Sequence, residues 1–196
     1  MDEDIRKRIS SFKKDLRNPS VSLDRIIDRY IVFGTPYIFR NNEDDYYSIK
    51  EEVAKSYKIR TSCIFMVGSS KLGFSIKPGQ LFREIQPDSD IDLTIIDSRI
   101  FDECWIKLLD FFYFEKLGVF SAEEVAKIQR FKEYFFKGWI RLDLLIPGMP
   151  LYKENAEIRK QLFNKYDNRT ASIGIFRDES FFQKYHELNI NKLRNK

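Results

Sequence analysis

Four short apolar runs, each of strand length, stand between longer segments whose apolar residues recur at helical spacing. The runs occupy residues 62–67, 91–96, 139–146 and 170–177. The runs at 62–67 and 91–96 are apolar on both faces, which predicts strands of a sheet that helices cover. The spacing predicts helices at residues 3–17, 22–33, 43–57, 98–116, 121–137, 151–166 and 179–193. This order predicts an α+β domain built around one small sheet.

The length of 196 residues predicts one domain, or one domain with a small helical appendage, and a proper hydrophobic core. Within it we expect a helical N-terminal extension at residues 1–42, a core at 43–146, and a C-terminal strand with helices at 147–196.

Composition and charge narrow the class of protein. Apolar residues make up 43% and charged residues 33% of the chain, as in folded globular proteins. The net charge is +4, and basic residues concentrate near the N-terminus. They form either the solvated face of a helix or a surface for a polyanionic partner such as nucleic acid. One histidine and two separated cysteines cannot form a zinc site.

The sequence also indicates in which compartment of the cell the protein is found. Residues Cys63 and Cys104 lie in apolar surroundings, which predicts buried thiols in a reducing compartment. The sequence shows neither an apolar run of membrane-spanning length nor a signal peptide. We therefore expect a cytoplasmic protein that does not insert into a membrane.

Two polar motifs stand at the ends of the first two predicted strands. The run 62–67 ends in Gly68-Ser69-Ser70, and Asp90 and Asp92 flank the start of the run 91–96. A strand that ends in Gly-Ser and enters a helix exposes backbone N–H groups that bind phosphate oxygens. Two carboxylates at positions i and i+2 of a strand point to one face, where they can share Mg²⁺. Together the motifs predict a site for a metal–nucleotide complex.

The segment GSS…SDIDLTII resembles the signature of the DNA polymerase β-like nucleotidyltransferase superfamily, including its small bacterial members. The resemblance implies a small mixed sheet of about four to five strands. It assigns Gly68, Ser69 and Ser70 to nucleotide binding, and Asp90 and Asp92 to divalent ions, Mg²⁺ or Mn²⁺. It also implies a third carboxylate, which binds metal and takes part in catalysis, on a later strand.

Asp143, in the run 139–146, is the best-placed residue for that third carboxylate. Strand alternation puts it on the same face as Arg141, so the alternative is a salt bridge between the two. The gap between Ser69 and Asp90 is longer than in the family motif. It carries Lys71, Lys77 and Arg83, which are either contacts for the triphosphate or solvated loop charges.

The resemblance implies transfer of a nucleoside monophosphate from an NTP or dNTP to a hydroxyl group, with release of pyrophosphate. The preferred expectation is an oligonucleotide-type product or signal made in bacterial antiviral defence. Primer extension and adenylylation of a partner protein, as in toxin–antitoxin nucleotidyltransferases, are the enzymatic alternatives. The non-enzymatic alternative is a module that binds nucleotide, nucleic acid or a partner protein without turnover.

Overall fold

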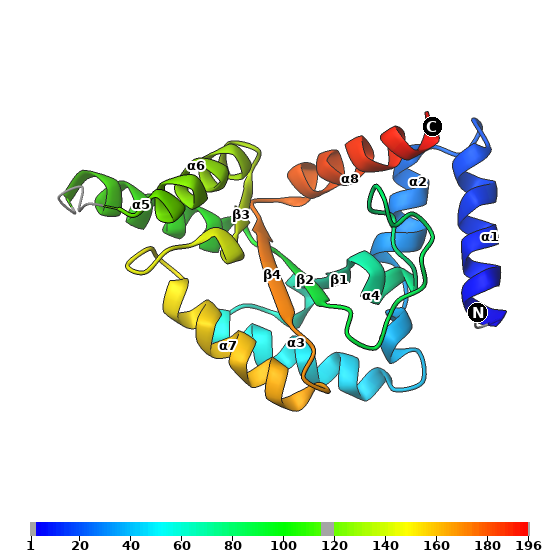
Figure 1. The fold of residues 1–196 in the computed structure, drawn as a ribbon, viewed down its shortest axis with the longest axis horizontal. Coiled ribbons are helices and arrows are strands. Elements are labelled where there is room, and N and C mark those ends of the chain that lie inside the picture. The colour runs from blue at the N-terminus through cyan, green and yellow to red at the C-terminus, as the bar shows by residue number, and fades with distance from the viewer. Residues whose placement is uncertain (1–2, 115–119, 196) are drawn as a thin grey trace.

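The computed structural model describes residues 3–114 and 120–195, and this part of the chain folds into helices around one sheet (Figure 1). The helices are α1 (Glu3–Arg17), α2 (Leu23–Ile27), α3 (Glu43–Tyr57), α4 (Gly68–Leu72), α5 (Ser98–Phe114), α6 (Ala122–Phe136), α7 (Tyr152–Lys165) and α8 (Glu179–Arg194). The strands are β1 (Ile64–Val67), β2 (Ile91–Ile96), β3 (Trp139–Arg141) and β4 (Ala171–Phe176). A π-helical turn at Asp28–Val32 continues α2.

The sheet has the order β1-β2-β4-β3. Strands β1 and β2 pair antiparallel, β2 and β4 pair parallel, and β4 and β3 pair antiparallel. The prediction of an α+β domain with a small mixed sheet is therefore confirmed. Strand β4 lies inside the sheet, so residues 147–196 complete the core and are not an appendage to it.

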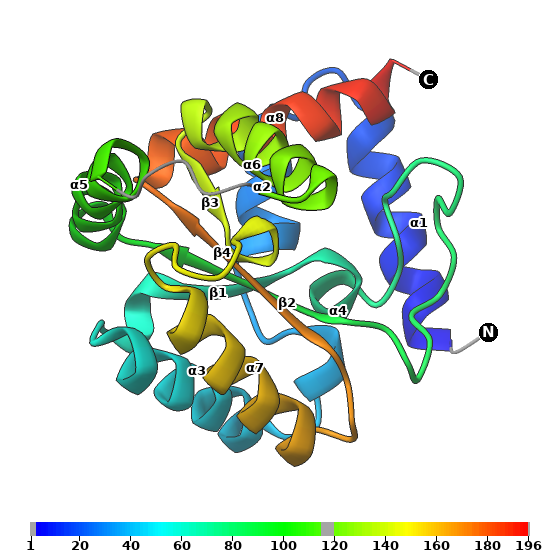
Figure 2. The ribbon, with the colours of Figure 1, turned by 60° about the vertical axis from the view of Figure 1, so that its left-hand side comes forward.

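Each face of the sheet packs against its own group of helices (Figure 2). In β2, Ile91, Leu93 and Ile95 pack with α3, α5 and α7. The next residues along the strand, including Asp92 and Thr94, alternate to the opposite face, which α8 covers in part. Polar side chains of β2 are thereby placed between the sheet and the C-terminal helix.

The long segment between the two motifs folds back on itself and packs against α1. Its stem is held by a hydrogen bond from the N–H of Ser75 to the carbonyl of Arg83 at 2.8 Å. Phe74 and Phe82 contact the ring of Phe12 in α1, with centroid distances of 5.6 and 6.4 Å. The N-terminal helix thus fixes the segment that forms one wall of the site.

The predicted strand 139–146 is wrong in its second half, where Leu142–Leu144 forms a 3₁₀ turn. The Asn155 side-chain amide of α7 donates a hydrogen bond to the carbonyl of Leu142 at 3.2 Å. That bond satisfies a backbone group that would otherwise need a strand partner. The apolar run is still buried, but it is buried in a turn.

The structure also places the two cysteines and the basic N-terminal helix, for which a polyanionic partner stays a prediction. Cys104 is buried as predicted, whereas Cys63 is only half-buried. Helix α1 buries Ile5, Ile9, Phe12 and Leu16, and its Lys7 pairs with Glu3 on the exposed side, as a solvated helix face would. None of the helices in residues 3–114 and 120–195 is long and apolar enough to cross a membrane.

Candidate functional site

The two sequence motifs meet at the end of β1. Val67, the last residue of β1, pairs with Asp92 of β2. The next residue, Gly68, has a φ of +68°, and a Cβ atom placed on it would lie 2.4 Å from the Asp92 Oδ2 atom. Only glycine allows both this backbone conformation and this close approach of the carboxylate. The glycine-serine turn and the aspartate pair are therefore parts of one site.

Opposing influences act on the pKa of the Asp92 carboxylate. Burial raises its pKa, and the charge of Asp90 acts in the same direction. A hydrogen bond from the Ser172 hydroxyl to Asp92 Oδ1, 2.6 Å long, acts in the opposite direction, as do the charges of Lys77 and Arg141. A divalent cation beside Asp92 would offset the cost of burying its charge.

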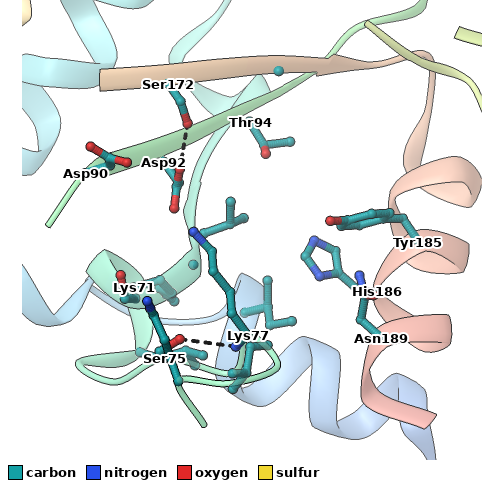
Figure 3. Close-up of a pocket in the computed structure, with 18 of the residues that line it drawn as sticks. Lys71, Ser75, Lys77, Asp90, Asp92, Thr94, Ser172, Tyr185, His186 and Asn189 are labelled. Carbon is teal, nitrogen blue, oxygen red and sulfur yellow. Dashed lines mark hydrogen bonds between the residues drawn. The ribbon is translucent and has the colours of Figure 1, made fainter. Parts of the chain in front are cut away.

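A cavity of about 920 Å³ opens in front of the two aspartates (Figure 3). Its volume lies in the range of small-molecule sites, roughly 300–1,000 Å³. Eight residues predicted to bind nucleotide or metal line it: Gly68, Ser69, Lys71, Lys77, Arg83, Asp90, Asp92 and Asp143. The Lys77 side chain points from the loop toward Asp92. The structure thus gathers residues from the start of α4, the long loop, the start of β2 and the turn after β3.

Two predicted nucleotide-binding side chains are engaged elsewhere. The hydroxyl of Ser70 is buried and donates a hydrogen bond to the backbone carbonyl of Asp90. Lys71 is 4% exposed, and its ammonium group donates to the carbonyls of Phe33, at 2.7 Å, and Gly34. Burial lowers the pKa of Lys71 to about 8. Both side chains brace the turn, and in this arrangement neither is free to bind phosphate.

Asp143 lies at the cavity but is bound to its neighbour. Arg141 donates two hydrogen bonds to it, from Nε at 3.1 Å and from a terminal nitrogen at 2.6 Å. This is the salt bridge that strand alternation offered as the alternative reading. On the parallel strand β4, the residue directly beside Asp92 is Ser172.

The donor set fits a metal ion held by two protein carboxylates. Asp90 and Asp92 supply the oxygen ligands that Mg²⁺ prefers, and Mg²⁺ commonly completes its shell with water and substrate phosphates. Among residues 3–114 and 120–195, the structure assembles no group of three acidic, histidine or cysteine side chains that would hold a metal. A fully protein-bound, three-carboxylate centre is therefore not formed in this conformation.

The cavity has a second polar wall, which the sequence did not reveal. Tyr185, His186 and Asn189 project into it from α8, and Thr94 projects from β2 (Figure 3). In the sequence these α8 residues form part of an ordinary amphipathic helix. The one available signal is their spacing of i, i+1 and i+4, which puts them on one helix face.

His186 is buried and should make stability depend on pH. Its pKa is lowered by burial to about 4, from an ordinary 6.5, so the unfolded chain binds the proton more tightly. The stabilising effect of the neutral ring is therefore complete above pH 6.5 and is lost as pH falls toward 4. We expect the free energy of unfolding to fall by roughly 2 kcal/mol between pH 7 and pH 5 on account of this group.

Urea unfolding at the two pH values measures this change. The matched variant is His186→Phe, which keeps a ring against Phe182 and removes the titrating group. An equal pH dependence in both proteins would show that other groups cause it.

Comparisons with known proteins do not assign a family. No family model matches the chain, and no match is found among curated proteins or solved structures. The functional argument therefore depends on the chemistry of the site.

Proposed function

We propose that this protein is a Mg²⁺-dependent nucleotidyltransferase. It would transfer a nucleoside monophosphate from an NTP or dNTP to a hydroxyl group and release pyrophosphate. The observation that carries the proposal is the contact between Gly68 and the Asp92 carboxylate at the mouth of a nucleotide-sized cavity. Phosphate-binding backbone and metal-binding carboxylates are thereby adjacent, as such a substrate requires.

In this proposal Asp90 and Asp92 hold the metal together with the triphosphate. The bound metal supplies electrostatic stabilisation of the charge that develops on the phosphates. Lys77 and Arg83, both exposed at the cavity, add positive charge toward the phosphate oxygens. The acceptor oxygen forms a bond to the α-phosphorus as the bond to the β-phosphate oxygen breaks, so pyrophosphate leaves.

Asp143 takes the proton of the acceptor hydroxyl in the proposed reaction. Its salt bridge with Arg141 must first open, and the side chains are 39% and 25% exposed, respectively. The pair is bidentate and Arg141 is half-buried, so opening it costs more than the ~0–1 kcal/mol of a fully exposed ion pair, and the binding energy of the substrate must offset that cost. Asp143 then lies at the same cavity as the metal-binding pair.

For the acceptor hydroxyl we keep the expectation that comes from the sequence resemblance. We propose an oligonucleotide-type product or signal in bacterial antiviral defence, and adenylylation of a partner protein is the second enzymatic possibility. The Arg141–Asp143 pair favours a further candidate, a module that binds nucleotide without turnover, because both oxygens of Asp143 are already occupied.

Incubation with each labelled NTP and dNTP, with Mg²⁺ or Mn²⁺, tests the proposal. We expect pyrophosphate release and a new product detectable by mass spectrometry in the native protein. Because the double variant Asp90→Ala/Asp92→Ala lacks both proposed metal ligands, we expect it to lose the release by roughly 1,000-fold or more.

The control variant is Asp110→Ala, which removes an exposed carboxylate of α5 outside the cavity residues. Equal release by the native protein and the double variant would refute the assignment. Nucleotide binding without any product would support the binding module.

A further inference from the structure

The cavity extends beyond the phosphate end to the polar wall of α8. In Figure 3, Asp90 and Asp92 lie at one side, and Tyr185, His186 and Asn189 face them from the other. A nucleotide whose triphosphate binds at the aspartates therefore directs its base toward one of the remaining walls. The α8 wall is polar on the surface it presents to the cavity.

One buried nitrogen atom of this wall has no hydrogen-bond partner among the described residues. The His186 side chain is 7% exposed, and its Nε2 atom has no hydrogen-bond partner among the described residues. The Trp139 Nε1 atom, on another residue that lines the cavity, is also buried without a partner in the described part of the chain. Buried polar groups of native proteins are nearly always paired, so a ligand in the cavity that reaches these atoms after a small side-chain shift would supply the missing partners.

The chemistry of the wall selects among ligands. A neutral imidazole and a carboxamide each offer a donor and an acceptor. Tyr185 contributes an aromatic ring; burial raises the pKa of its hydroxyl, and Asn189, one helical turn further along the same wall, is close enough to act in the opposite direction. An amide pairs in a bidentate manner with the donor and acceptor that adenine presents on one edge. Guanine presents two adjacent donors, N1–H and N2–H, which a carboxylate accepts best, and these three α8 residues include no carboxylate.

We propose that the α8 wall of Tyr185, His186 and Asn189 binds the nucleobase of the substrate and prefers adenine. This inference depends on the proposed function, because it assumes that the triphosphate lies at Asp90 and Asp92. Asn189 and His186 supply the hydrogen bonds, and the Tyr185 ring supplies a stacking surface.

A tryptophan signal makes the base preference measurable. Trp139 lines the cavity, and Trp105 lies exposed on α5, so Trp105→Phe leaves one reporter. This protein is titrated with ATP, GTP, CTP, UTP and inorganic tripolyphosphate, each with Mg²⁺. We expect ATP to bind about 10-fold more tightly than GTP, as a bidentate contact provides. Tripolyphosphate has no base, so its affinity should not depend on the α8 wall.

Variants separate this inference from the proposed function. Asn189→Ala should bring ATP and GTP to within about threefold of each other and leave tripolyphosphate binding unchanged. Asn189→Asp should move the preference toward GTP, because its carboxylate accepts from N1–H and N2–H. Asp92→Asn should weaken every ligand, tripolyphosphate included. Thermal unfolding confirms that each variant is folded.

Two results contradict different claims. Similar affinities for the four nucleotides, or a preference that Asn189→Ala and Asn189→Asp do not change, would overturn the base site and leave the phosphate site standing. Tripolyphosphate binding that is insensitive to Asp92→Asn would overturn the proposed function itself.

Discussion

Replacing Asp143 with asparagine is expected to lower the rate of pyrophosphate release by roughly 100-fold or more, the usual contribution of a general base. Affinity for MgATP should change by less than about threefold, because Asp90 and Asp92 hold the metal–triphosphate end. Asparagine keeps the size of the side chain, and its amide oxygen still accepts one hydrogen bond from Arg141. Single-turnover kinetics measures the rate, and the Trp139 titration measures the affinity.

Arg141→Gln is the matched variant for this prediction. It breaks the same salt bridge from the other side and leaves the Asp143 carboxylate in place. If Asp143 acts in the reaction, Arg141→Gln should retain far more activity than Asp143→Asn. If the two residues form only a structural pair, both variants should lower stability slightly, with turnover equal to that of the native protein. The second result would exclude Asp143 as the general base and would leave the proposed metal–triphosphate site at Asp90 and Asp92 untouched.

Local signals in the sequence were sufficient for most helix and strand boundaries. At the start of the predicted helix 121–137, Ser121 and Glu124 form a capping box, with each side chain bonded to the other residue's backbone N–H. The run at 91–96 matches β2 at both ends. The strand prediction for 139–146 failed beyond Arg141, where Asn155 of α7, the next helix along the chain, satisfies the Leu142 carbonyl. Such a tertiary contact leaves no mark in the local pattern of apolar residues.

The sequence predicted those parts of the candidate site that lie in its two motifs, Gly68-Ser69-Ser70 and Asp90/Asp92. The end of one strand and the start of the next meet whenever the two pair antiparallel, which places Gly68 beside Asp92. The direction of Lys71 was not predictable, since it depends on carbonyls at Phe33 and Gly34 that a remote turn presents. The α8 wall was missed for a similar reason. Nothing local distinguishes a helix face that covers a cavity from one that covers a core.

Gly68→Ala is expected to lower the free energy of unfolding by roughly 3 kcal/mol and to weaken MgATP binding at least about 10-fold. Two costs combine in the stability change. A left-handed backbone costs a non-glycine residue about 1–2 kcal/mol, and overpacking costs a further ~1–3 kcal/mol. The new methyl group would press on Asp92 Oδ2, so the proposed metal ligand must move. Urea unfolding and the Trp139 titration measure the two effects.

Gly79→Ala separates the two costs. Gly79 has a φ of +80°, like Gly68, but no described heavy atom beyond its chain neighbours lies within 4 Å of a Cβ placed there. This variant should therefore lose only the backbone cost of about 1–2 kcal/mol and bind MgATP normally.

A double variant isolates the contact itself. In a background carrying Asp92→Ala, the atom that the new methyl group would meet at 2.4 Å is gone. Gly68→Ala should then cost no more than Gly79→Ala, and the two changes at 68 and 92 should be less than additive. Additive costs would mean that the Gly68 backbone and the Asp92 carboxylate act independently. The contact between Gly68 and Asp92 would then no longer support a single site for phosphate and metal.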